Sequence, residues 1–186
     1  MTAFIQGENI ALHKLAPDRL HSLMMAEWLT DNEVTQLLFA GLLPTSQKAV
    51  REEWRASIQN PNEIAFIIYS GPLGYVTEKE FIGTAGLYTI NWIARTADFR
   101  IFIGDKGRWG QGIGTKVTRL VLDYAFNKLN LQMVGLGVNT ENKAAVRVYE
   151  KAGFVHEGTL RRVQYRNGRY YDVYRMSILQ EEFGNA

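Results

Sequence analysis

A glycine-rich loop joins a predicted strand to a predicted helix past the middle of this 186-residue chain. The segment 101–114 reads IFIGDKGRWGQGIG, and it runs directly into an amphipathic helical pattern. Glycines leave backbone N–H groups open to a ligand, and the N-terminus of the following helix adds the positive end of its dipole. Together these features predict a cradle for a phosphate or pyrophosphate group. The glycines concerned are Gly107, Gly110, Gly112 and Gly114.

Two common phosphate-binding motifs do not fit this loop. A Walker loop ends in Gly-Lys-Ser/Thr, whereas here Lys116 follows Thr115. A dinucleotide-binding loop belongs at the first strand–helix turn of a parallel sheet, whereas these glycines follow several strands that have an antiparallel pattern. A surface loop before a capped helix would show the same glycines, so the loop alone does not identify the ligand.

Two segments resemble the signatures of the GNAT superfamily of N-acetyltransferases. Residues 109–114, WGQGIG, resemble the loop that binds the acyl-CoA pyrophosphate, and residues 139–154, NTENKAAVRVYEKAGF, resemble the second signature. One departure is Trp109, which stands where the family often has Gln or Arg, and Arg108 precedes it. The tail around 157–172 resembles the branch of ribosomal-protein, spermidine and amino-sugar acetyltransferases.

The resemblance covers about residues 8–183, which implies a single N-acetyltransferase domain over 1–186. The hydrophobic pattern predicts the same class, an α/β fold with a mixed, mostly antiparallel sheet in the order βααβββαβαββ. Expected strands are 9–15, 63–70, 80–89, 98–104, 132–138, 157–165 and 169–179. The resemblance also implies a splay between the fourth and fifth strands, where the pantetheine arm of acetyl-CoA fills the gap.

Local signals predict where several elements begin and end. Pro17 is expected to open the first helix, Ser46 and Asn142 to cap later helices, and Gly153 to end the helix that Asn142 caps. Asn167-Gly168 predicts a hairpin turn. A second turn is expected at 70–74, and 31–44 is expected to be a connection rich in apolar residues.

The resemblance implies both a catalytic residue and a cofactor site. Tyr149 matches the tyrosine that lies near the thioester sulfur, and a phenol is protonated at neutral pH and can act as an acid. Packing on the sheet is the alternative role for Tyr149, and helix capping alone would explain Asn142. The expected acetyl-CoA site consists of Ile101, Phe102, Ile103, Arg108, Trp109, Gly110, Gln111, Gly112, Ile113, Gly114, Thr115, Asn139 and Asn142.

The general base is less well indicated by the sequence. Glu33, after the first helix, and Asp98, at the start of the fourth strand, are the candidates, and each would need burial or a water relay to act as a base. The alternative is an enzyme without a dedicated base, which uses the neutral fraction of the amine. His13, His21 and His156 have no metal-site spacing, so no metal is expected.

The expected reaction is transfer of an acetyl group from acetyl-CoA to a primary amine, either of a small molecule such as an amino sugar or of a protein N-terminus. A non-catalytic acyl-CoA-binding module and a spermidine acetyltransferase are the alternatives. Residues 37–43, LLFAGLL, contain no carboxylate for a polycation, which ranks spermidine below other amines. The last hairpin instead carries arginines suited to anionic groups, Arg161, Arg162, Arg166, Arg169 and Arg175.

Composition excludes several other classes of protein. The chain has no cysteine, which excludes disulfides and cysteine nucleophiles. Its net charge of +2 is too small to indicate a nucleic-acid partner. No signal peptide is visible and no apolar run approaches the ~20 residues of a membrane span, so we expect a cytoplasmic protein with no membrane partner. A homodimer or a higher homo-oligomer is left open.

Overall fold

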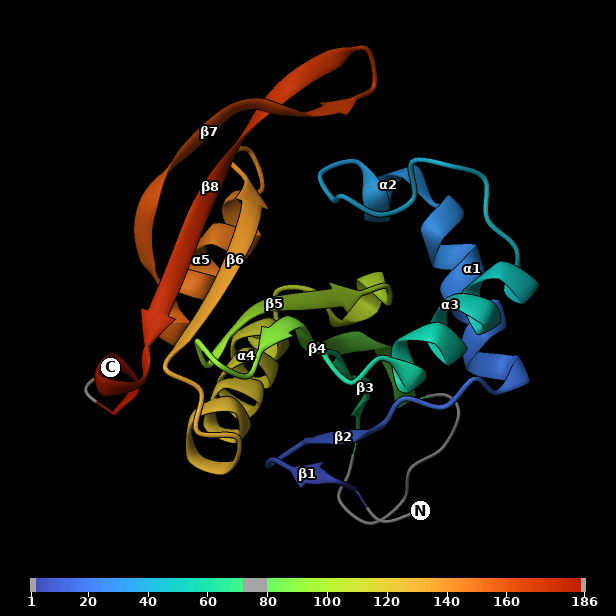
Figure 1. Ribbon diagram of the computed structural model, residues 1–186. Helices are drawn as coiled ribbons and strands as arrows, with labels where there is room; N and C mark the ends of the chain where they lie inside the picture. Colours follow the sequence, from blue (N-terminus) through green and yellow to red (C-terminus); the bar gives the residue numbers. More distant parts are fainter. Residues whose placement is uncertain (1–2, 72–79, 185–186) are drawn as a thin grey trace.

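A computed structural model describes residues 3–71 and 80–184 (Figure 1). Eight strands in this part of the chain form one mixed sheet in the spatial order β1-β2-β3-β4-β5-β6-β8-β7. The strands are β1 (Ile5–Gln6), β2 (Ile10–Lys14), β3 (Ile64–Ser70), β4 (Phe81–Asn91), β5 (Thr96–Ile103), β6 (Met133–Asn139), β7 (Val155–Arg166) and β8 (Arg169–Leu179). The helices are α1 (Arg19–Thr30), α2 (Asn32–Thr35), α3 (Gln47–Gln59), α4 (Ile113–Asp123), α5 (Lys143–Ala152) and α6 (Gln180–Phe183).

The sheet is divided into two halves that meet only briefly. β5 and β6 run parallel, and their register pairs Thr96 with Met133, Ala97 with Val134 and Asp98 with Gly135. Beyond Asp98 the two strands have no paired residues, and Figure 1 shows them diverging. The splay expected between the fourth and fifth predicted strands is therefore confirmed. These strands are β5 and β6 of the structure, because the short strand β1 was not predicted.

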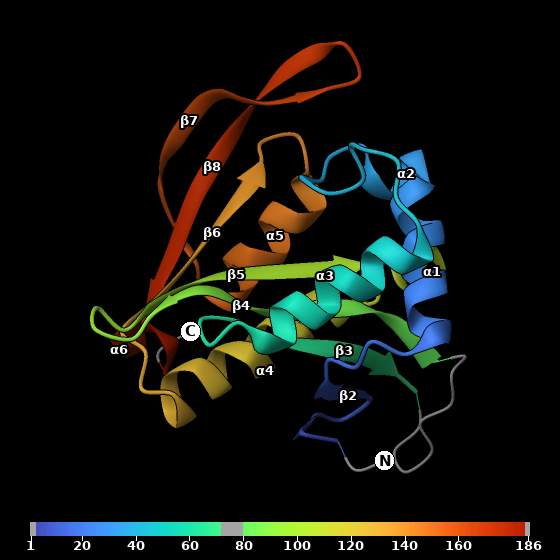
Figure 2. The same ribbon diagram turned by 45° about the vertical axis from the view of Figure 1, so that its right-hand side comes forward.

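Helices cover both faces of the first half of the sheet (Figure 2). Side chains alternate along a strand, and β3 accordingly sends Phe66 and Ile68 to one hydrophobic cluster and Ile67 and Tyr69 to the other. The first cluster contains the buried faces of α4 and α5, and the second contains those of α1 and α3. The same alternation in β5 places Phe99 in the first cluster and Phe102 in the second.

Most local signals are confirmed. The Ser46 side chain accepts from the Ala49 N–H at 3.2 Å and that of Asn142 accepts from the Ala145 N–H at 3.1 Å, so both are N-caps. Gly153 ends α5 in the left-handed conformation, with φ 102°. Asn167 and Gly168 both have positive φ, as a type I′ hairpin turn requires.

Three expectations need correction or lie outside the described residues. The first helix begins at Arg19, not at Pro17, because the Asp18 carboxylate accepts from two N–H groups and makes Asp18 the N-cap. The connection 31–44 contains the short helix α2, which Asp31 caps through the Glu33 N–H. The predicted turn at 70–74 falls mostly within 72–79, outside the described residues.

Candidate acetyl-CoA and acceptor site

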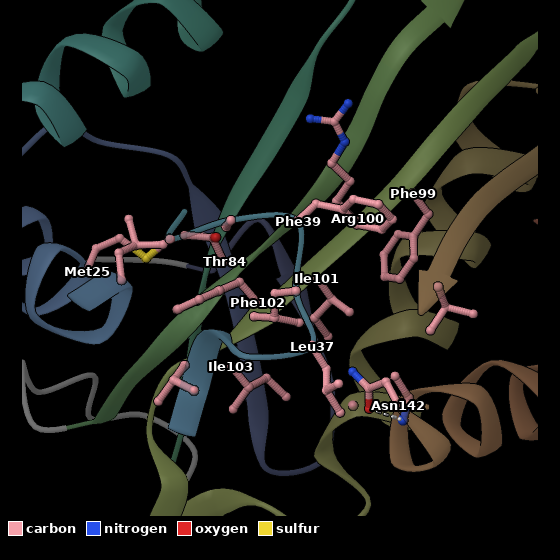
Figure 3. A pocket seen from close by; sticks show the side chains of 18 of the residues that line it. Met25, Leu37, Phe39, Thr84, Phe99, Arg100, Ile101, Phe102, Ile103 and Asn142 are labelled. Carbon is pink, nitrogen blue, oxygen red and sulfur yellow. Dashed lines mark hydrogen bonds between the residues drawn. The ribbon is translucent and has the colours of Figure 1, made fainter. Parts of the chain in front are cut away.

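A cavity of about 1230 Å³ opens where β5 and β6 diverge. Its wall includes the second half of β5, the glycine loop and the start of α4, the end of β6, and α5. The opposite wall is made by residues 36–45 and by α3. Figure 3 shows side chains from both walls, including Leu37, Ile101 and Asn142. The splay thus places the expected cofactor residues and the apolar connection around one space.

The glycine loop has the backbone geometry of an anion cradle. Gly110 and Gly112 are left-handed, with φ 74° and 76°, and a Cβ added at either would meet nothing within 4 Å. Gly112 is also the N-cap of α4 and has no side-chain cap, so N–H groups of the first turn remain open. A Cβ at Gly114 would lie 3.3 Å from Val148, so this glycine lets α4 approach α5 closely.

Side chains of the loop fix its position relative to β5. The Trp109 indole donates to the Ile103 carbonyl at 3.0 Å, which ties the loop to the end of the strand. The Gln111 side chain donates to the Gly107 carbonyl at 2.7 Å, and Gln111 does not line the cavity. Trp109, the departure from the family pattern, therefore has a structural role here, and Arg108 beside it lines the cavity.

Tyr149 lies in the cavity wall and is 8% exposed. Its ring packs edge-on against Phe99 and Phe154, at centroid distances of 6.3 and 5.8 Å. Burial raises the pKa of Tyr149 to about 12, because the charged phenolate would lose its hydration. The phenol is therefore a neutral hydrogen-bond donor across the whole physiological pH range.

Two asparagines stand at the end of β6 and the start of α5, and both line the cavity. The Asn142 Oδ1 atom caps α5, which leaves its amide Nδ2 as a donor for a ligand. Asn139 is 1% exposed, and its amide bonds instead to Gln164 and to the Glu141 N–H. The structure thus gives these two expected cofactor residues different partners.

The two candidate bases lie in different places. Glu33 lines the cavity, and its carboxylate pairs with the Lys106 ammonium at 2.7 Å. Glu33 and then Asp31 raise the pKa of Lys106 through these contacts, which joins α2 to the glycine loop. Asp98 does not line the cavity, and its carboxylate accepts from Arg175 at 3.1 Å and from Thr89 at 3.2 Å.

The cavity is also lined by two carboxylates that the sequence analysis did not assign to it. Glu53 of α3 and Glu63, which precedes β3, line it together with Tyr88 and Arg100. Burial raises the pKa of Tyr88 to about 12; the Arg100 guanidinium, 4.6 Å from the centre of its ring, opposes this shift, and the negative charges of Glu63 and Glu53 add to it. The apolar segment 37–43 is thus not the whole wall. No sequence signal could have shown this, because the four residues meet only in the folded chain.

Cationic groups line the cofactor side of the cavity. Arg147 and Lys151 are four residues apart on α5, and both contribute to its wall along with Arg108. A spacing of four residues places both side chains on one face of the helix. Their charges suit the phosphate groups of a nucleotide.

In residues 3–71 and 80–184, no group of three metal-ligating side chains is gathered. No helix in the same ranges combines the length and the apolarity that crossing a bilayer requires.

A family model of the acetyltransferase (GNAT) domain matches residues 9–155. The chain belongs to the GNAT acetyltransferase family. The fold is similar to that of a solved spermidine N-acetyltransferase from Vibrio cholerae in complex with CoA and spermine. The two structures superpose with a TM-score of 0.82 and a sequence identity of 32%, and the match covers 96% of this chain and 100% of that one.

Curated relatives of this GNAT domain include two bacterial spermidine N(1)-acetyltransferases. The one from Vibrio cholerae serotype O1 is 44% identical over 108 residues, which cover 58% of this chain and 62% of that protein. The one from Escherichia coli K12 is 38% identical over 106 residues, which cover 57% of this chain and 56% of that protein. The matched region thus spans about three fifths of these relatives.

Proposed function

We propose that this GNAT domain transfers an acetyl group from acetyl-CoA to a primary amine of a small molecule. The observation that carries the proposal is the coincidence of three features in one cavity: the splayed β5–β6 edge, the glycine cradle and the buried phenol of Tyr149. The solved relative in complex with CoA and spermine supports the same assignment.

The residues around the splay fit acetyl-CoA. Backbone N–H groups at 110–115 and the N-terminus of α4 would hold the pyrophosphate, and Arg108, Arg147 and Lys151 would neutralise phosphate charge. The unpaired edge of Ile101, Phe102 and Ile103 would hydrogen-bond the pantetheine amides, since backbone groups without a partner must otherwise be solvated. The free amide of Asn142 is a further donor at the same edge.

Acetyl-CoA supplies an activated acyl group as a thioester. The neutral amine forms a bond to the acyl carbon, the carbon–sulfur bond breaks, and the thiolate that leaves takes a proton. Tyr149 is the donor we assign to this step, because its neutral phenol hydrogen-bonds to the sulfur as negative charge develops there. The proton lost by the amine passes to solvent, which also reprotonates Tyr149.

We assign no direct base role to Asp98, whose carboxylate is paired outside the cavity wall. Glu33 lines the cavity, but its contact with Lys106 makes it a component of a surface ion-pair network. We therefore propose that the amine reacts through its neutral fraction. Of the two carboxylates, Glu33 is the one that lines the cavity and could relay a proton through water.

The acceptor side of the cavity has a mixed character. Phe39, Leu42 and Leu43 are more than half exposed, and they present an apolar surface to whatever enters. This surface favours an amine that carries an apolar body, because a second ammonium placed there would lose hydration without gaining a partner. Glu53 and Glu63 favour the polyamine alternative, in agreement with the names of the relatives.

Specificity constants for a panel of amines test the acceptor assignment. The panel contains spermidine, an arylalkyl monoamine, an amino-sugar nucleotide and a short peptide with a free N-terminus, with thiol release from acetyl-CoA as the signal. We expect the monoamine with an apolar body to give the highest kcat/KM. A highest value for spermidine would overturn the apolar-acceptor argument, and a highest value for the peptide would overturn the small-molecule assignment.

A further inference from the structure

The β7–β8 hairpin holds the acceptor wall through a buried arginine. Arg166 is 5% exposed, although its neighbours on the hairpin are exposed. Its guanidinium donates to the Ala40 carbonyl at 3.0 Å and to the Gly41 carbonyl at 2.9 Å. The guanidinium thus hydrogen-bonds to a backbone segment 125 residues away in the sequence and is not free to bind an anionic ligand.

A chain of amide groups makes a second connection to the same segment. The Asn139 Nδ2 atom donates to Gln164 Oε1 at 2.8 Å, and Gln164 Nε2 donates to the Leu38 carbonyl at 2.7 Å. Gln164 is 6% exposed, so these amides meet in a dry environment where an unpaired partner would be costly. The chain runs from the end of β6, beside the cofactor edge, to the acceptor wall.

Outside the hairpin contacts, the segment is held mainly near Leu38, whose N–H donates to the Thr35 carbonyl at 2.9 Å and whose side chain packs against the second hydrophobic cluster. Residues 37–46 belong to no helix or strand, and the hairpin binds the carbonyls of Leu38, Ala40 and Gly41. Gly41 is left-handed and lies close to Leu29 and Thr35, which leaves no room for a side chain. Residues 36–45 all line the cavity, and the apolar side chains of Leu37, Phe39 and Leu42 are among them (Figure 3 labels the first two).

We propose that Gln164 and Arg166 are positioning residues for the acceptor. They hold segment 37–43 so that its apolar side chains form a fixed wall opposite β5, and they thereby set acceptor affinity and specificity without touching the reacting atoms. This inference rests on the proposed acetyltransferase function. It differs from the expectation that Arg166 binds an anionic group of the acceptor.

Arg166→Met and Gln164→Met test the proposal, because each removes donors while keeping a side chain of similar length. We expect the KM of the acceptor to rise about tenfold in both variants, as the loss of one buried hydrogen bond or more predicts. The KM of acetyl-CoA should stay within about twofold in Arg166→Met, whereas Gln164→Met also leaves the Asn139 amide beside the cofactor edge without its partner. Amide hydrogen exchange in 36–45 should accelerate in both variants. Arg166→Lys, which keeps one charged donor, should restore part of the acceptor affinity.

Tyr165→Ala is the matched control, since Tyr165 lies between the two residues, is exposed and makes its ring contact with Tyr170. It should change neither KM nor the exchange. An unchanged acceptor KM and unchanged exchange in folded Arg166→Met or Gln164→Met would overturn the inference, and so would an equal rise in both KM values of Arg166→Met. If the wild type acetylates no amine, the proposed function fails, and the exchange measurement still decides whether the hairpin holds the segment.

Discussion

At the scale of single residues, the environment of Tyr149 decides its chemistry. The ring packs against Phe99 and Phe154, the residue lines the cavity, and the hydroxyl has no hydrogen bond to any described residue. A phenol in such a place can donate to a leaving sulfur, and the pKa that burial raises keeps it protonated.

Tyr149→Phe should lower chemistry-limited turnover by roughly 10²–10⁴-fold, the usual contribution of a general acid. CoA affinity should stay within about twofold, because the ring and its packing remain. Stopped-flow thiol release separates the two quantities. Tyr124→Phe is the control, since Tyr124 is partly buried and does not line this cavity. A fall in turnover of less than about threefold would make Tyr149 a packing residue.

The pH profile of the wild type provides a second check on Tyr149. We expect kcat/KM to rise with pH as the amine loses its proton and to show no falling limb up to pH ~10, because a phenol with a pKa of about 12 is still protonated there. A tyrosine acid with an ordinary pKa would give a falling limb near pH ~10. A falling limb that the wild type shows near pH ~10 and that Tyr149→Phe lacks would contradict the burial argument.

At the scale of elements, the loop and the helix that follows it form the cradle together. The left-handed Gly112 sits at the N-terminus of α4, where both the open N–H groups and the helix dipole favour an anion. A carboxylate placed at this point would oppose the bound phosphates at close range.

Gly112→Asp should weaken CoA binding more than tenfold, because it adds like charge and because aspartate adopts a left-handed backbone at a cost of about 1 kcal/mol. Titration calorimetry with CoA measures the change. Gly112→Ala keeps the backbone strain without the charge and should lose less affinity. Gly184→Asp adds the same charge at an open position away from the cavity and should leave affinity unchanged. Unchanged affinity in folded Gly112→Asp would remove the pyrophosphate site.

Elements with local signals were predicted well from the sequence. Ser46, Asn142, Gly153 and Asn167-Gly168 act within a few residues of themselves, so their chemistry is visible in a short window. The prediction that Pro17 opens the first helix was wrong. The Asp18 carboxylate, one residue later, accepts from two N–H groups and sets the start of α1. The π-helical turn Tyr124–Lys128 that ends α4 had no sequence signal that separates it from an ordinary helix.

At the scale of the whole molecule, contacts between distant segments escaped prediction. Glu53 and Glu63 reach the cavity only because α3 and β3 border it, and Arg166 turns inward only because segment 37–43 brings carbonyl groups to it. The glycine loop could be placed between β5 and α4 because the three are contiguous in the sequence, whereas its assignment to acetyl-CoA came from the resemblance to the GNAT family and stays a prediction. The acceptor side is assembled from parts that lie far apart in the sequence, among them segment 36–45, α3 and Glu63.

The central claim is that the splayed cavity brings acetyl-CoA and an amine together for acetyl transfer. The most direct test is the stoichiometry of one reaction, with released thiol measured by absorbance and acetylated amine measured by mass spectrometry in the same sample. We predict one acetylated amine per thiol, at a rate that depends on the amine. Thiol release without acetylated amine would indicate hydrolysis, and CoA binding without thiol release above the uncatalysed rate would indicate a non-catalytic binding module; either result would contradict the claim.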